Sequence, residues 1–161
     1  MSQKGPDARS PADSSVEMTE IVLPGGTNAL GTAFGGTIFG WIDIAAAVAA
    51  QRHSRGMAVT ASIDSLAFVA PVHLGDVVLL HARVNRAWRT SMEVGVRVEC
   101  EQAGLPESRK HAATAYLTFV AVDDAGAPRA VPPIAPQTDE DRRRFAKADQ
   151  RRTRRLAARA P

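Results

Sequence analysis

The sequence predicts an α+β domain in which an antiparallel sheet wraps around one long central helix, with a charged helix at the C-terminus. Residues 37–50 are apolar on every helical face, apart from one aspartate, which predicts a helix buried on all sides. Strand-like segments without crossover helices flank this helix, and such a sheet can curl around a helix and bury it. The closing segment begins with Thr138 and Asp141, the spacing of a capping box.

The elements follow in order along the chain. Strands are expected at residues 17–23, 57–69, 77–88, 91–100 and 109–123, and the last helix at residues 138–158. Residues 91–100 alternate strictly, with Met92 opening an apolar face and Glu93 a polar one, which predicts one face buried and one in solvent. We therefore divide the chain into a disordered tail (1–15), one domain (16–135) and a basic C-terminal helix (136–161).

Composition restricts the function classes. The net charge of +3 arises at the C-terminus, where residues 142–159 hold nine of the 20 lysines and arginines. Cys100 is the only cysteine, which excludes an intrachain disulfide and favours a cytoplasmic location. Cysteine and histidine do not cluster, so we expect no metal. The N-terminus has no apolar run typical of a secretory signal, and the central helix is too short and too rich in small residues to predict a membrane span.

Asp43 is the one charged residue of the central helix. Its helical neighbours three and four positions away are Phe39, Gly40, Ala46 and Ala47, and none can pair with a carboxylate. Such a group must meet a partner from elsewhere, meet a ligand or keep its proton. Gly35 and Gly36 open the same helix, where free N–H groups favour a negatively charged oxygen. An acid and a backbone oxyanion site on one element predict ester or thioester hydrolysis.

Several motifs together resemble a known family. They are Thr27-Asn28, Phe34-Gly35-Gly36, Asp43 with the alanine-rich turns after it, Val59-Thr60, Pro71-Val72 followed by Gly75-Asp76, and Thr118 to Asp123. The pattern runs from about residue 20 to 135 and resembles the hotdog-fold acyl-CoA thioesterases of the YciA and cytosolic acyl-CoA hydrolase type.

The resemblance implies a hotdog fold and hydrolysis of acyl-CoA to coenzyme A and a fatty acid, with no cofactor beyond the coenzyme A of the substrate. It also implies a homodimer, often assembled into a trimer of dimers (a hexamer). The active site would lie at the dimer interface, with Asn28 of one chain near Asp43 of the other.

Roles for the catalytic residues follow from their chemistry. Asp43 would act as general base on water or as nucleophile, and the sequence leaves both open. The backbone N–H of Gly36, with that of Gly35, would hold the oxyanion; the alternative is a plain tight turn. Asn28 would orient the water or the carbonyl group, or would simply form an Asx-turn in its loop.

The phosphates of coenzyme A require arginine, lysine and hydroxyl donors. The candidates are Arg89, Thr90 and Ser91 at a strand junction, and Arg52 and His53 at the end of the central helix; Arg52 and Arg89 are otherwise solvated charges. Three aromatic residues, Phe34, Phe39 and Trp41, predict a partly filled acyl tunnel and short- to medium-chain substrates.

Two alternatives keep the fold: a non-catalytic acyl-CoA-binding or regulatory protein, and a hotdog enoyl-CoA hydratase. The second requires an Asp–His pair, and no histidine follows Asp43 before His53. The basic C-terminal helix raises nucleic-acid or anionic-surface binding as a further class. Acids interspersed among its arginines favour a solvated helix packed on the assembly, so we expect neither nucleic acid nor membrane as a partner.

Overall fold

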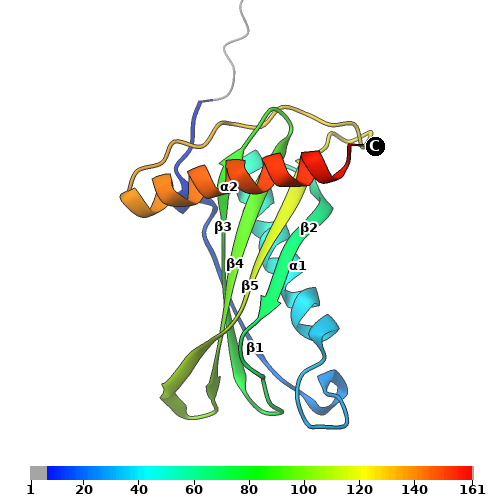
Figure 1. Ribbon diagram of the computed structural model, residues 1–161, viewed down its shortest axis with the longest axis vertical. Helices are drawn as coiled ribbons and strands as arrows, with labels where there is room; N and C mark the ends of the chain where they lie inside the picture. The colour runs from blue at the N-terminus through cyan, green and yellow to red at the C-terminus, as the bar shows by residue number, and fades with distance from the viewer. Residues whose placement is uncertain (1–6, 161) are drawn as a thin grey trace, which may run out of the picture.

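The computed structural model describes residues 7–160; residues 1–6 and 161 lie outside the described part. One five-stranded antiparallel sheet, with strand order β1-β3-β4-β5-β2, is combined with two long helices (Figure 1). The elements are β1 (Val16–Ile21), α1 (Gly35–Ser54), β2 (Ala58–Phe68), β3 (Val77–Ala87), β4 (Ser91–Gln102), β5 (Leu105–Ala121) and α2 (Asp139–Ala158), with short 3₁₀ turns η1 (Pro11–Ser14) and η2 (Pro24–Gly26). The predicted α+β fold is confirmed.

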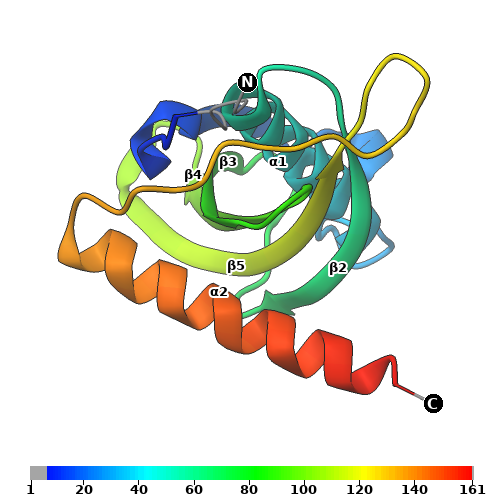
Figure 2. The same ribbon diagram turned by 90° about the horizontal axis from the view of Figure 1, so that it is seen from above.

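The sheet curls around α1 on its inner face, and α2 crosses the outer face (Figure 2). The inward side of α1 is made of two isoleucines and four alanines that are fully buried: Ile38, Ile42, Ala45, Ala46, Ala49 and Ala50. Small side chains let the helix approach the strands closely. The inner face of the sheet supplies the larger residues of the core, including Leu80, Met92, Leu117 and Phe119.

One face of α1 is nevertheless open. Gly36, Gly40 and Ile44, spaced four residues apart and therefore aligned on one side of the helix, are exposed. The prediction of a helix buried on all sides is wrong for the single chain. Strand β2 lies at one edge of the sheet, and its Val59 and Ile63 are also about half exposed. Ile63 pairs with the inward-facing Leu117, whereas Val59 pairs with Val120 on the outer face, so we name the strip formed by Gly36, Gly40, Ile44 and Ile63 the open face.

The N-terminal segment is ordered from Arg9 onward. Ser14 is completely buried, and its hydroxyl accepts a hydrogen bond of 2.9 Å from the N–H of Val84 on β3. Arg9 donates its N–H to Pro133 O at 2.9 Å and its guanidinium to His53 O at 3.0 Å. The predicted disorder of residues 1–15 is therefore wrong for this part, because tertiary hydrogen bonds hold a segment whose composition alone gives no sign of a partner.

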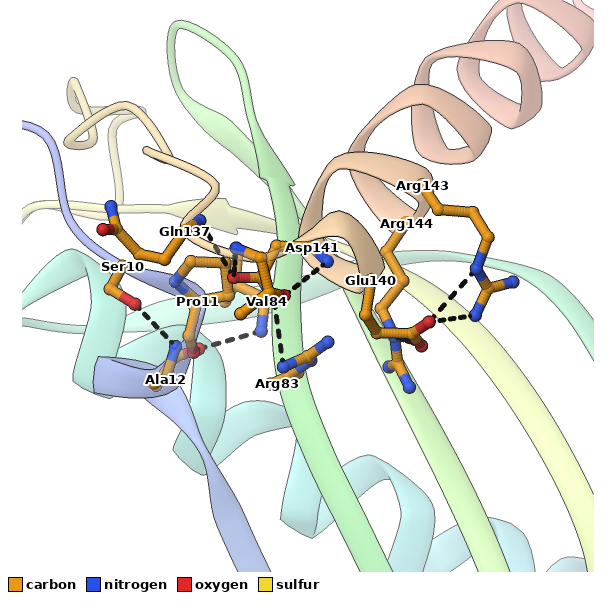
Figure 3. Close-up of polar contacts among 12 residues, drawn as sticks. Ser10, Pro11, Ala12, Arg83, Val84, Gln137, Glu140, Asp141, Arg143 and Arg144 are labelled. Carbon is orange, nitrogen blue, oxygen red and sulfur yellow. Dashed lines mark hydrogen bonds and ion pairs between the residues drawn. The ribbon is translucent and has the colours of Figure 1, made fainter.

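The start of α2 follows the predicted capping box. Thr138 Oγ1 accepts from Asp141 N at 3.0 Å, and Asp141 Oδ2 accepts from Thr138 N at 3.2 Å. Burial alone would raise the pKa of Asp141, but hydrogen bonds from Gln137 and Thr138, with Arg83 3.2 Å away, lower it (Figure 3). The neighbouring Glu140 has its pKa lowered to about 2 by hydrogen bonds from Arg143 and Arg144.

The packing of α2 buries part of the predicted solvent face of β4. Glu93 is fully buried and accepts two hydrogen bonds from Arg151, at 2.9 and 2.7 Å, and one from Asn85 Nδ2 at 3.0 Å. Gly95 on the same face leaves room for Asn85, because a Cβ there would lie 2.7 Å from Asn85 Nδ2. The side chains of β4 alternate as predicted. Its polar face, however, is exposed to solvent only where α2 does not cover it.

Candidate active site

Asp43 lies halfway along α1 beside the edge strand β2. Thr60 Oγ1 donates a 2.7 Å hydrogen bond to Asp43 Oδ1. The side chain is half-buried, and within residues 7–160 no cation lies within 4 Å of it and no second donor reaches it. The carboxylate is thus oriented through one oxygen, while the other is free to accept a proton from water or to attack a carbonyl carbon.

Gly35 and Gly36 form the first turn of α1. The N-cap residue Phe34 offers no side-chain hydrogen bond, and the first helical bonds run from Thr37 N and Ile38 N to Phe34 O, at 3.0 and 3.3 Å. No acceptor for the N–H groups of Gly35 and Gly36 is found within residues 7–160. An atom added as Cβ at Gly36 would have no neighbour within 4 Å, so a substrate can approach this N–H directly.

An apolar cleft of ≈ 400 Å³ opens beside this turn. Its walls come from the start of α1 and from the chain that follows β2: Thr32, Ala33, Gly35, Ile38, Phe68, Val69, Ala70, Pro71 and Val72. Trp41 and Phe39 instead pack against the hydrophobic core, and Phe34 is half exposed outside the cleft. The three aromatic residues chosen from the sequence are therefore not the walls of this cleft.

The distance between Gly36 and Asp43 limits what one chain can do. They are seven positions apart in the sequence, which corresponds to about 10 Å along the helix axis. An aspartate side chain is much shorter than this. A thioester carbonyl held by the N–H of Gly36 would therefore lie well away from the carboxylate of the same helix, which favours donors from a second chain.

Asn28 has the loop role that the sequence left open as its alternative. Its Oδ1 accepts from Leu30 N at 2.9 Å and from Thr32 N at 3.2 Å, and its Nδ2 donates to Thr32 Oγ1 at 2.8 Å. The bond to Leu30 is an Asx-turn. Since a side-chain amide has two N–H donors, one remains available.

The proposed coenzyme A ligands come from the last turn of α1 and from the turn between β3 and β4, which lies toward the same end of the sheet in Figure 1. Ser91 Oγ accepts from Arg152 at 3.2 Å, and Val131 N bonds to Arg89 O at 3.1 Å, so the Arg89–Ser91 turn lies near α2. The guanidinium of Arg52 donates to Ser15 O. A role for Arg52, Arg89, Thr90 and Ser91 in binding phosphate stays a prediction.

His53 does not suit that role. It is fully buried, and its Nε2 lies 2.7 Å from Pro132 O. Burial lowers its pKa, with the nearby Arg9 adding to this, so the ring is neutral at pH 7. A buried neutral imidazole cannot contact a phosphate on the surface, and the sequence-based assignment of His53 is corrected accordingly.

Thr60 belongs to the family pattern seen in the sequence, but it was assigned no role in the site from the sequence. A register shift between Thr60 and Ser62 places Thr60 opposite Phe119, on the inner face, and Ser62 opposite Thr118, on the outer face. Simple alternation would put both residues on one side. Within residues 7–160 no three His, Cys, Asp or Glu side chains gather as a metal site would require, and no helix there is long and apolar enough to cross a membrane.

A helix wrapped by an antiparallel sheet, with an acid facing an open edge and a helix N-terminus beside an apolar cleft, defines the hotdog class of thioesterases. The thioesterase superfamily profile matches residues 30–107. A Bacillus subtilis relative, the uncharacterized acyl-CoA thioester hydrolase YkhA, is 42% identical over 136 residues, which cover 84% of this chain and 78% of that one. The chain belongs to this family of acyl-CoA thioester hydrolases, which are enzymes. It also matches mouse acyl-coenzyme A thioesterase 11 (38% identical over 141 residues), but spans only 24% of that protein's length, with 88% of this chain aligned.

Solved structures agree. An apo-hexameric acyl-CoA thioesterase matches with a TM-score of 0.91 and 40% identity, over 96% of this chain and 98% of that one. The acyl-CoA hydrolase of Staphylococcus aureus, in complex with butyryl coenzyme A, coenzyme A and coenzyme A disulfide, matches with a TM-score of 0.88 and 38% identity, over 94% and 92%. Structures of that protein also exist with Asn28, Asp43 or Thr60 of its own sequence replaced by alanine.

Proposed function

We propose that this protein hydrolyses the thioester of acyl-CoA, releasing coenzyme A and a free fatty acid. Asp43 acts as general base or nucleophile, Thr60 orients it, and the N–H of Gly36, with that of Gly35, stabilises the oxyanion. The observation that carries the proposal is the Asp43 carboxylate, which Thr60 holds through one oxygen at 2.7 Å, while no other described side chain donates to it and no described cation lies within 4 Å. The same three residue types at positions 28, 43 and 60 of the Staphylococcus aureus protein support the choice.

Either chemical route uses the same parts. As a base, Asp43 takes a proton from water while the oxygen of that water attacks the thioester carbon. As a nucleophile, Asp43 attacks the carbon itself and forms an acyl-enzyme anhydride, which water then cleaves. In both routes the carbonyl oxygen becomes negative, and the sulfur leaves with the electron pair of the C–S bond. The N–H groups of Gly35 and Gly36 donate hydrogen bonds to this oxygen.

A second copy of the chain completes the site. Because Gly36 lies about 10 Å from Asp43 along the axis of one helix, we place the donors on the partner's helix. The open face supports this arrangement, since it combines an unpaired strand edge with exposed apolar residues next to Asp43. The dimer is the minimal unit, and the description of a related enzyme as hexameric supports a trimer of dimers.

The cleft beside Gly35 is our site for the acyl chain. Its walls are apolar and its volume of ≈ 400 Å³ is at the small end for ligand sites, which supports short- to medium-chain substrates. The free N–H of Asn28 orients the carbonyl group or the attacking water. We also propose a cytoplasmic location, which the single thiol, buried at Cys100, supports.

The decisive experiment replaces Asp43 with asparagine and follows release of coenzyme A with a thiol reagent. We expect kcat to fall by about 10³ or more, since the reaction loses its base or nucleophile, while affinity for coenzyme A changes little. Asp124→Asn is the matched control, because Asp124 is an exposed turn residue remote from the site. Wild-type turnover no faster than buffer would leave a non-catalytic acyl-CoA binder instead.

Hydration of enoyl-CoA has less support. Thr60 is the only side chain within residues 7–160 that hydrogen-bonds Asp43, and the histidine that follows on α1, His53, is buried against Pro132. The Asp–His pair of such an enzyme is therefore missing from the described chain.

A further inference from the structure

A second pocket, of ≈ 630 Å³, lies on the outer face of the sheet, on the opposite side from α1. It forms where the C-terminal half of α2 meets β2. Its lining consists of residues 62–65 of β2, which include Asp64 and Ile63 of the open face, together with Arg151, Arg154, Arg155 and Ala158 of α2 and Arg159 directly after it. Its volume is in the range of small-molecule sites, and nothing in the proposed hydrolysis uses it.

Two of the arginines are fixed and neutralised by buried acids. Arg155 donates to Asp64 Oδ2 and to Thr118 Oγ1, both at 2.8 Å. Arg151 is paired with Glu93 and stacks on the ring of Tyr116, with its guanidinium carbon 3.6 Å from the ring centroid. These contacts make the inner wall of the pocket rigid and leave it without net charge.

The other two arginines, Arg154 and Arg159, have no acid partner among the described residues. Within residues 7–160 no carboxylate lies within 4 Å of Arg154 or Arg159, and both side chains are exposed at the rim. The first half of α2 differs, because Arg142, Arg143 and Arg144 each pair with an acid three or four residues earlier. A cation near a helix C-terminus is favoured by the helix dipole, but the dipole does not explain why two unpaired arginines border a preformed pocket.

We propose that this pocket binds a small anion that carries adjacent phosphates, a diphosphate or triphosphate group. Arg154 and Arg159 provide the charge and the planar donor pairs that phosphate oxygens accept. Ser65 provides a hydroxyl donor beside them, whereas Ser62 is bonded to Asp64 at 3.0 Å. Asp64 does not repel the ligand, since Arg155 neutralises it. Two sources share this chemistry: the diphosphate of coenzyme A itself, or a separate nucleotide or polyphosphate.

The test titrates the full-length protein with pyrophosphate in a calorimeter. We expect one site per chain, and at least about tenfold weaker binding in Arg154→Ala/Arg159→Ala, since two charged donors are lost. Arg142→Ala/Arg143→Ala is the matched control, because it removes two charges from α2 outside this pocket, and it should change affinity less than about twofold. Thermal melting of each variant verifies folding, and Arg154→Lys/Arg159→Lys, which keeps the charge, should bind with intermediate affinity.

No binding to wild type at millimolar pyrophosphate, or equal weakening in the control pair, would overturn the proposal. A second titration in saturating coenzyme A distinguishes the sources. Pyrophosphate excluded by coenzyme A identifies the diphosphate of the substrate as the ligand, and unchanged binding identifies a separate phosphorylated molecule. The readout is binding rather than turnover, so a failure of the proposed hydrolase activity would not be mistaken for a failure of this site.

Discussion

At the scale of single residues, Gly36 offers an N–H that no described residue accepts. If this group stabilises the oxyanion, Gly36→Pro should lower kcat by about 10²–10³, because one donor is lost while the first helical turn tolerates proline. Gly36→Ala keeps the N–H, and its added Cβ meets no atom of the chain within 4 Å. The alanine variant should therefore retain kcat, with any loss appearing in KM. Steady-state kinetics and circular dichroism of both variants check this, and a folded proline variant with wild-type kcat would contradict it.

The buried His53 makes stability depend on pH. Burial lowers its pKa from the ordinary 6.5, opposed by the hydrogen bond to Pro132. As pH falls below 6.5, His53 becomes protonated in the unfolded chain but stays neutral in the folded chain. The free energy of unfolding therefore falls. His53→Gln retains a donor for Pro132 O and does not titrate. Between about pH 7.5 and about pH 5.5 the Tm of wild type should fall more than that of the variant; equal slopes would show that His53 does not contribute.

Residues differ in how far the sequence reveals them. Asp43 could be identified because a lone charge on an apolar helix has no partner within that helix. Its carboxylate therefore had to interact with a group or a ligand from outside the helix. Thr60 could be matched to the family pattern, but its role could not be predicted, because a bulge reverses the alternation of β2 and only the folded chain brings this threonine to 2.7 Å from Asp43. His53 was misassigned because a histidine in the last turn of a helix is typical of an exposed position, and the burial arises from the distant Pro132.

At the scale of elements, α2 is held to the sheet by buried ion pairs and by arginines stacked on aromatic rings. Arg86 lies 3.9 Å from the centroid of Phe145, and Arg152 lies 4.4 Å from that of Trp88. The capping box at its start follows from local chemistry and was predictable to the residue. The position of α2 on the sheet was not predictable, because an Arg-rich helix is as compatible with solvent exposure as with packing on the sheet. The buried Glu93, paired with Arg151, is what favours packing on the sheet.

The Glu93–Arg151 pair allows a direct test of this docking. Arg151→Ala leaves a fully buried carboxylate with only Asn85 as donor, so the free energy of unfolding should fall by about 3 kcal/mol. Arg154→Ala, one turn further along α2 and unpaired, should change it by less than about 0.5 kcal/mol. Urea titrations measure both values. A small effect at Arg151 would mean that α2 is docked by its apolar and stacked contacts alone.

At the scale of the whole molecule, the fold was predictable because few arrangements of the chain can bury one apolar helix against strands with alternating apolar residues. What the sequence could not give is the asymmetry of α1. A helix with apolar residues on all sides does not indicate which side a second chain covers. In the structure, Gly36, Gly40 and Ile44 are exposed along one side of α1, next to the edge strand, and this side is the one left for a second chain. Asp43 thus lies at the surface of the single chain where we expect a second chain to pack.

A shared site predicts that two inactive variants restore one another. In a mixed dimer of Asp43→Asn and Gly36→Pro chains, one site carries both substitutions and the other carries none, because each site takes its carboxylate from one chain and its N–H donor from the other. After equal amounts are unfolded and refolded together, half of the dimers are mixed and half of their sites are intact, so activity should return to about one quarter of wild type. Each variant refolded alone serves as the control. If the mixture is no more active than these controls, both groups act within a single chain, and the dimer is not the catalytic unit.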